Sequence, residues 1–210
     1  MDYATDEERV EELKKWWKEN GTSVIFGVVL GLSILFGWRW WGDYQLNQSV
    51  QASTLYNQLE LSIQQKKPEQ ADALSQKLST QFESHAYAVY ASMAMAKMKV
   101  DEKDIAAAQT HLQWGLDHAK TPELNHLLTL RLARLLLTNN EVDKAYALVD
   151  SQNQNQFAAS YEELKGDILV KKGSADLAFL AYQKAALLAP KGSAVSPALQ
   201  YKIDDLTRSQ

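Results

Sequence analysis

The sequence predicts an all-α protein, in which a single N-terminal transmembrane helix is followed by an α-solenoid of about four helical hairpins. The stretch from Gly21 to Trp38 carries no charged residue. The remainder is rich in alanine, leucine, glutamine and lysine and shows no β-branched alternating run. Its four prolines separate apolar-periodic runs, which is typical of many short helices. We therefore expect a tail at residues 1–20, an anchor at 21–41 and a repeat domain at 42–210.

The apolar stretch has the length and the flanks of a membrane span. Between Glu19 and Arg39 lie 19 uncharged residues, and a bilayer core needs roughly 20 residues of helix. Five of the six tryptophans flank it as expected interfacial anchors: Trp16, Trp17, Trp38, Trp40 and Trp41. A buried core helix, the alternative, would not need tryptophan at both ends. The bulky residues after the stretch do not fit a signal-peptide cleavage site, so we expect the anchor to be retained.

The distribution of basic residues predicts the orientation. Four precede the span, whereas Arg39 is followed by no lysine or arginine until Lys66; the four are Arg9, Lys14, Lys15 and Lys18. The positive-inside rule then places the N-terminus in the cytoplasm. In a bacterium, the chain would be a single-pass type II inner-membrane protein with a periplasmic C-terminal domain.

Two helical faces near the N-terminus are candidate contact surfaces. In the tail, Val10, Leu13 and Trp17 share one face, which either serves a partner or belongs to a solvated helix with none. In the span, small residues recur every four positions and would let another membrane helix approach closely; they are Ser23, Gly27 and Gly31. The alternative for this second face is the ordinary glycine content of membrane helices.

Composition excludes several classes of function. After the tail, 18 basic and 19 acidic residues nearly cancel, so the chain lacks the charge of a nucleic-acid-binding protein. The absence of cysteine excludes disulfides and thiol chemistry. The four histidines show no metal-ligand spacing, and no phosphate loop or nucleophile elbow is present. We expect no cofactor, no metal and no enzymatic activity.

The helices are predicted to pair, and the pairs to repeat. Thr121-Pro122 and Ser196-Pro197 have the pattern of an N-cap followed by proline at the first helical position, and Lys67-Pro68 marks another break. Near the C-terminus, residues fall at the small, large, turn, aromatic and proline positions of a 34-residue tetratricopeptide repeat. They are Gly166, Leu169, Gly173, Ala178, Tyr182, Ala185 and Pro190.

Earlier units match this pattern less closely. Two middle units place Leu132, Ala133, Leu136 and Ala145, and Met95, Ala96, Ala108 and Leu112, at equivalent positions. A degenerate first pair is expected between Tyr44 and Phe82. Glu162 and Lys165 depart from the pattern, because the repeat prefers tryptophan and leucine there.

In such a solenoid the first helices of successive hairpins line a concave surface that binds peptides or protein segments. Projecting the repeat offsets gives nine candidate residues: Tyr90, Met93, Lys97, Leu127, Leu130, Arg134, Glu163, Asp167 and Lys171. Alternatively, the terminal helix at 196–206 covers Met93, Leu127 and Leu130.

The whole chain resembles the YfgM family of ancillary SecYEG translocon subunits, most specifically in the exit motif Gly37-Trp38-Arg39-Trp40-Trp41 and the units LRLARLLL and ADLAFLAYQKA. The resemblance implies a type II inner-membrane protein with a periplasmic repeat domain. It implies three partners: the SecYEG translocon, the membrane-anchored chaperone PpiD, and translocating client proteins passed to periplasmic chaperones. It supplies no catalytic residues. The alternative is a membrane-tethered scaffold or envelope-stress regulator that acts through its cytoplasmic tail.

Overall fold

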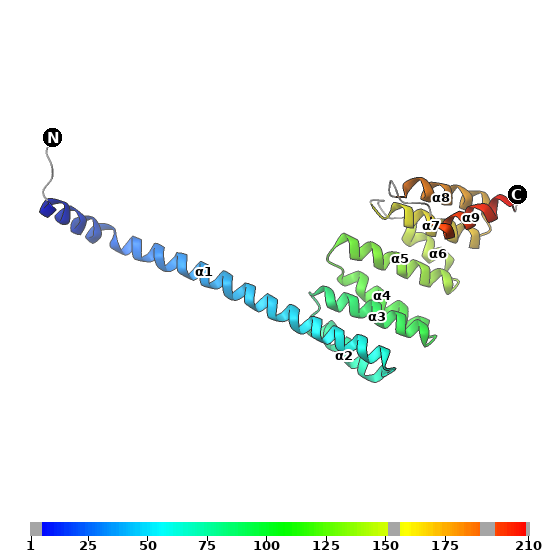
Figure 1. Ribbon diagram of the computed structural model, residues 1–210, viewed down its shortest axis with the longest axis horizontal. Helices are drawn as coiled ribbons and strands as arrows, with labels where there is room; N and C mark the ends of the chain where they lie inside the picture. The colour runs from blue at the N-terminus through cyan, green and yellow to red at the C-terminus, as the bar shows by residue number, and fades with distance from the viewer. Residues whose placement is uncertain (1–5, 151–155, 190–195, 209–210) are drawn as a thin grey trace. The chain divides into compact units, whose positions relative to one another are not determined.

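The structure, a computed structural model, describes residues 6–150, 156–189 and 196–208. Helices form all the regular structure in these ranges, which confirms the predicted all-α class (Figure 1). Their bounds are α1 (Asp6–Gln64), α2 (Pro68–Gln81), α3 (Ala86–Asp101), α4 (Ile105–His118), α5 (Pro122–Thr138), α6 (Val142–Asp150), α7 (Ala158–Lys171), α8 (Ala175–Leu188) and α9 (Pro197–Arg208). The chain divides into two compact units, Met1–Gln51 and Ala52–Gln210.

The first unit consists of the N-terminal part of α1. No proline lies between Asp6 and Gln64, and the described part of the expected tail, the expected anchor and the first repeat helix all lie in one helix. Of the helices described, α1 alone is long and apolar enough to cross a membrane. Polar side chains in and before the apolar stretch bond within the helix: Asn20 Nδ2 donates to the Trp16 carbonyl at 3.0 Å, and Ser33 Oγ donates to the Val29 carbonyl at 2.8 Å.

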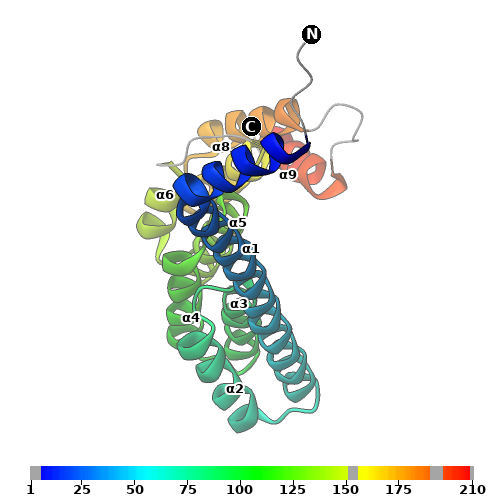
Figure 2. The same ribbon diagram turned by 90° about the vertical axis from the view of Figure 1, so that its left-hand side faces the viewer.

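The second unit is a stack of helical hairpins. The C-terminal end of α1 packs with α2 and α3 through a shared apolar cluster. The next pairs are α3–α4, α5–α6 and α7–α8, and α9 packs on α8. In Figure 2, α2, α4 and α6 lie one above another in one layer of the stack, and α3 and α5 lie in a second layer beside it. These four pairs confirm the predicted hairpin solenoid.

Each hairpin turns through one residue in the left-handed backbone region. Lys66, Lys103, Asn140 and Gly173 have φ values of 56°, 66°, 64° and 76°. In every turn, this residue and its successor donate backbone hydrogen bonds to carbonyls at the end of the preceding helix, for example Lys103 N to Val100 O and Asp104 N to Lys99 O. This is the Schellman pattern, which satisfies the carbonyls left free where a helix ends. Only the last turn uses glycine.

An alanine at the same place in each second helix lets the hairpin close. Ala71, Ala108, Ala145 and Ala178 are all 0% exposed. They are separated by 37, 37 and 33 residues, so the first pair repeats with the same period as the others. The predicted caps are also present: the Thr121 side chain accepts from Leu124 N, and Ser196 Oγ accepts from Leu199 N. Pro190, the last repeat position predicted, lies outside the described residues.

The last hairpin shows why its departures from the repeat are tolerated. A side chain at Gly166 would overlap the Tyr182 ring, so the glycine admits the aromatic residue between α7 and α8. Glu162, at the position where tryptophan is usual, is buried at 4% exposure but pairs with Lys184 Nζ at 2.5 Å. Lys165, the other departure, extends over the Tyr146 ring and pairs with Asp150 at 2.6 Å. Charged partners thus replace apolar contacts at these two positions.

Candidate protein-binding surface

The residues predicted to contact another membrane helix lie exposed on α1. Ser23, Gly27 and Gly31 are all exposed, and a Cβ at either glycine would meet no side chain within 4 Å. The predicted interfacial tryptophans are also exposed; among them Trp38 is 82% exposed. Trp17 differs, because its ring lies against Gly21. The small-residue face is therefore open for a close helix approach.

Three of the nine predicted groove residues come together around one hollow. Met93 and Lys97 from α3 and Arg134 from α5 line a cavity of about 290 Å³. Its base is apolar and nearly closed to solvent, with Ala96 3% and Leu135 7% exposed. The hollow lies between the first helices of the second and third hairpins, where the solenoid pattern places a binding groove.

Arg131 is the residue of this hollow that sequence reasoning missed. It is exposed, lines the cavity and lies one turn before Arg134 on α5. The i,i+3 spacing of the two arginines could have identified it, since residues three apart share a helix face. Three cationic side chains therefore line the hollow: Lys97, Arg131 and Arg134.

Tyr90 belongs to a neighbouring aromatic cluster. Its ring lies 6.2 Å from Tyr56 and 6.0 Å from Tyr87, centroid to centroid. The Tyr56 hydroxyl donates to Glu60 at 2.9 Å. Burial and this carboxylate raise the pKa of Tyr56 to about 12, whereas the positive charge of Arg131 opposes the rise. Arg131 therefore acts on this cluster as well as lining the hollow.

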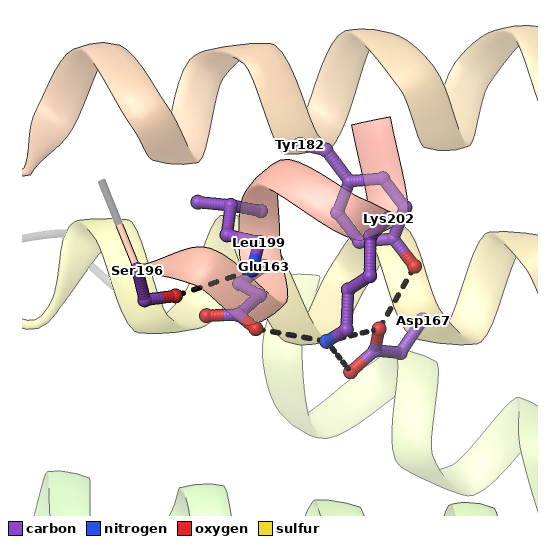
Figure 3. A network of polar contacts seen from close by, with 6 residues as sticks. All are labelled: Glu163, Asp167, Tyr182, Ser196, Leu199 and Lys202. Atoms are coloured by element: carbon purple, nitrogen blue, oxygen red, sulfur yellow. Dashed lines mark hydrogen bonds and ion pairs between the residues drawn. The ribbon is translucent and has the colours of Figure 1, made fainter. Parts of the chain in front are cut away.

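The remaining predicted residues do not open into the hollow. Leu130 is 3% exposed and lies in the core, and Leu127 is half-buried against the same core cluster. Glu163 and Asp167 of α7 face α9, where Lys202 Nζ reaches them at 2.8 Å and 2.7 Å (Figure 3). Lys171 is exposed at the end of α7.

Lys202 is the centre of a polar network that docks α9. Burial lowers its pKa, but hydrogen bonds with Asp167 and Glu163 outweigh this and raise the pKa overall. The Tyr182 hydroxyl donates to Asp167 at 2.8 Å, and burial together with this carboxylate raises the pKa of Tyr182 (Figure 3). The network occupies both acidic groups that α7 was predicted to offer to a partner.

The terminal helix covers a different part of the stack from the one considered in the sequence. Leu199 and Leu206 of α9 pack with Leu169 and Tyr182 of the last hairpin. Met93, Leu127 and Leu130 instead belong to the cluster built from α3 to α7. Within the described residues, α9 thus packs on α7 and α8 and caps the end of the repeat stack.

A larger hollow of about 770 Å³ lies among α4, α5 and α6. Leu132 and Leu136 form its apolar base, and Trp114 lines its side. Its basic residue, Lys144, already pairs with Glu141 at 2.6 Å. This hollow contains none of the predicted groove residues and offers no cluster of free charges among the residues described.

The histidines make packing contacts. His118 stacks on Trp114 at 4.1 Å, its Nδ1 lies 2.7 Å from the Trp114 carbonyl, and its Nε2 lies 3.3 Å from Glu83. His126 Nδ1 lies 3.0 Å from the Tyr161 hydroxyl. Burial lowers the pKa of His111. No group of histidine, aspartate and glutamate in the described ranges is arranged to hold a metal ion.

Comparison with known proteins agrees with this architecture over nearly the full length. The family model described as a tetratricopeptide repeat-like domain matches residues 14–208. A Haemophilus influenzae protein named "Ancillary SecYEG translocon subunit" is 34% identical over 187 residues, which cover 88% of this chain and 91% of that protein. An Escherichia coli protein of the same name is 29% identical over 205 residues, 98% of each chain. A third protein of this name, from Neisseria gonorrhoeae, is 24% identical over 97% of this chain and 98% of its own. The apolar helix, the hairpin stack and these similarities together show that the chain belongs to the tetratricopeptide repeat-like YfgM family of ancillary SecYEG translocon subunits.

Proposed function

We propose that this chain is a non-catalytic ancillary subunit of the SecYEG translocon, which holds newly translocated proteins and helps to pass them to periplasmic chaperones. The observation that carries the proposal is that similarity to ancillary translocon subunits covers the membrane segment and the repeats together. A translocon subunit needs a membrane-embedded contact and a surface for clients. The exposed small-residue face of α1 and the hollow between α3 and α5 fit these two roles.

The proposal includes a topology and a chaperone partner. Basic residues before the span favour a cytoplasmic N-terminus, so the hairpin stack would lie in the periplasm of a single-pass type II inner-membrane protein. There it would meet translocating clients and the membrane-anchored chaperone PpiD, the partner that the family resemblance implies.

Site-specific photocrosslinking in native membranes tests the proposal. Probes at Gly27 and Gly31 should yield adducts with translocon subunits or a membrane chaperone, and probes at Lys97 and Arg134 should yield adducts with secreted chains or a chaperone. Val29, on the opposite face of the helix at the same depth, is the matched control. A probe there should give adducts with lipid, or few protein adducts. Adducts only between copies of this chain would contradict the translocon role.

A second candidate function rests on the exposed face of the tail. Val10, Leu13 and Trp17 are 49%, 65% and 51% exposed, so this apolar face is open to a soluble regulator. The chain would then act as a tethered scaffold or envelope-stress regulator. Replacing the three residues by serine distinguishes the roles: loss of function with translocon crosslinks retained would favour the scaffold, and unchanged function would exclude it.

A further inference from the structure

We propose that the hollow between α3 and α5 binds an extended peptide segment in which an apolar side chain is flanked by carboxylates. This inference rests on the proposed function, because it specifies the client chemistry that the repeat domain would recognise.

The hollow can receive one or two apolar side chains. Met93, Ala96, Leu112 and Leu135 line it, and each is less than 9% exposed, so the base is rigid core rather than mobile surface. Its volume of about 290 Å³ lies at the small end of ligand pockets. Val100 lies at its edge and is 40% exposed, which leaves apolar surface for an entering side chain to cover.

Three cations that lack an ion-pair partner in the described part of the chain gather around this hollow. Lys97, Arg131 and Arg134 form no ion pair with any described residue, although the whole chain carries a net charge of −4. Other exposed lysines of the repeat domain, such as Lys77 and Lys120, are also unpaired within the described ranges, but they do not line this hollow. The three cations differ from them because they lie on two facing helices around one apolar hollow.

The acidic residues on neighbouring elements do not neutralise this cluster. Lys202 engages Glu163 and Asp167 on α7, and the Tyr56 hydroxyl donates to Glu60 on α1. Asp101, one turn after Lys97 on α3, forms no ion pair with it. None of these carboxylates forms an ion pair with Lys97, Arg131 or Arg134, so the N–H donors of these three residues are available to a ligand at the apolar hollow.

The geometry favours carboxylates flanking the apolar group. Arg131 and Arg134 lie on successive turns of one face of α5. A guanidinium group binds a carboxylate through two parallel hydrogen bonds, so each arginine can hold one acidic side chain. Lys97 lies on the facing helix α3, so an extended chain could contact cations on both sides while its apolar side chain enters the hollow. Tyr90 and Tyr56 continue the surface with aromatic rings.

Peptide binding to the full chain in neutral-lipid nanodiscs tests this inference. The probe is a short fluorescein-labelled peptide that alternates leucine with glutamate and aspartate. Fluorescence anisotropy should show saturable binding that weakens as salt is added. A peptide with glutamine and asparagine in place of the acids should bind at least about tenfold more weakly, and so should one with serine in place of leucine.

Variants of the protein localise the binding. Arg131→Gln/Arg134→Gln should weaken binding about tenfold or more and reduce its salt dependence. The matched control Lys77→Gln/Lys120→Gln removes the same charge from exposed positions outside this hollow and should change affinity less than about twofold. Val100→Ser should weaken binding through the apolar part alone. Circular dichroism checks the fold of each variant. If the arginine variant unfolds, Val100→Ser and the peptide variants still show whether the hollow binds the acidic peptide.

The inference is overturned if the acidic peptide shows no saturable binding, if the amide peptide binds equally well, or if the control variant loses as much affinity. Binding of vesicles that contain anionic lipid, with no peptide binding, would assign the cations to the membrane surface and also overturn it. Photocrosslinks from Gly27 to the translocon separate the two proposals. If they persist while peptide binding fails, only the client chemistry is wrong; if they are absent, the translocon role itself fails.

Discussion

At the scale of single residues, the hairpin turns store backbone strain at three of four equivalent positions. Lys66, Lys103 and Asn140 have positive φ, whereas the last turn has Gly173. A side chain in this region costs about 1–2 kcal/mol, less for asparagine, because Cβ approaches the following carbonyl. The turns form nonetheless because each satisfies helix-end carbonyls.

Replacing Lys103 by glycine should therefore stabilise the protein by up to about 1 kcal/mol, and Gly173→Ala should destabilise it by about as much. Urea unfolding measures both changes. Lys103→Ala is the control, because it removes the same side chain but keeps Cβ and should give no gain. Equal gains from glycine and alanine would show that the side chain, not the backbone, limits stability.

The contact between Gly166 and Tyr182 gives a second prediction at this scale. Gly166→Ala should cost about 1–3 kcal/mol, because the new methyl group overlaps a ring that is 3% exposed and cannot move freely. Thermal unfolding should show a lower Tm. Combining it with Tyr182→Leu should recover part of the loss, whereas Tyr182→Phe, which keeps the ring, should not. Additive effects in both double variants would contradict a direct clash.

At the scale of elements, ion pairs tie α6 to its neighbours. Asp143 and Asp150 pair with Lys172 and Lys165 of the next hairpin at 2.7 Å and 2.6 Å. These lysines lower the pKa of both carboxyl groups. Hydrogen bonds from Lys144, Gln109 and Asn139 lower the pKa of Glu141, just before α6, to about 2. Helix α6 and the residue that precedes it thus carry three carboxylates that are more acidic than in an unfolded chain.

Stability should consequently fall in acid. A carboxyl group whose pKa is lower in the folded state stabilises fully above its unfolded pKa of about 4, and this stabilisation is lost as the pH falls through the folded value. We expect the urea midpoint to decrease slightly below about pH 6.5, because burial lowers the pKa of His111 and the unfolded chain takes up that proton first, and to decrease further from about pH 4.5 towards 2. Asp143→Asn/Asp150→Asn should flatten this second decrease. An unchanged slope in the variant would assign the acid sensitivity to other groups.

The docking of α9 depends on one lysine. Lys202→Met should release this helix and cost about 1–2 kcal/mol, because Glu163 and Asp167 lose a shared, half-buried partner. Hydrogen exchange should rise in Pro197–Arg208 and stay unchanged in α3. Adding Glu163→Gln and Asp167→Asn should restore part of the protection, because no carboxylate is then left without its cation. Unchanged exchange in α9 would mean that Leu199 and Leu206 suffice to hold it.

At the scale of the whole molecule, the proposed topology can be tested by labelling single introduced cysteines, because the chain contains no cysteine of its own that would also be labelled. A single cysteine introduced at Glu12 should be protected from a membrane-impermeant maleimide applied to the periplasmic side of intact cells. One at Lys120, an exposed position, should be labelled. Both should react after the membrane is dissolved, which is the control for accessibility. The reverse pattern would overturn the type II orientation inferred from the basic residues.

Helix class, the apolar segment and the hairpin period are local properties, and they could be predicted from the sequence. The length without charge indicates a segment that avoids water, and the positions of the prolines indicate where helices begin. The regular spacing of Ala108, Ala145 and Ala178 indicates repeated hairpins in which two helices pack closely. The same spacing extends to Ala71, so the first pair, which its sequence predicts to be degenerate, follows the period of the others. The continuity of α1 is consistent with the absence of proline before Pro68.

Only the tertiary structure decided which groove residues remain available. Repeat offsets place Met93, Lys97 and Arg134 on facing first helices, and these do meet at one hollow. The same offsets cannot show that Lys202, 35 residues after Asp167, returns to neutralise the acids of α7. Local spacing therefore determined the helical fold, the apolar segment of α1 and the pair of helices between which the hollow lies. Which charges stay unpaired depends on contacts between helices distant in sequence, because an ion pair forms wherever the packed chain brings its partners together.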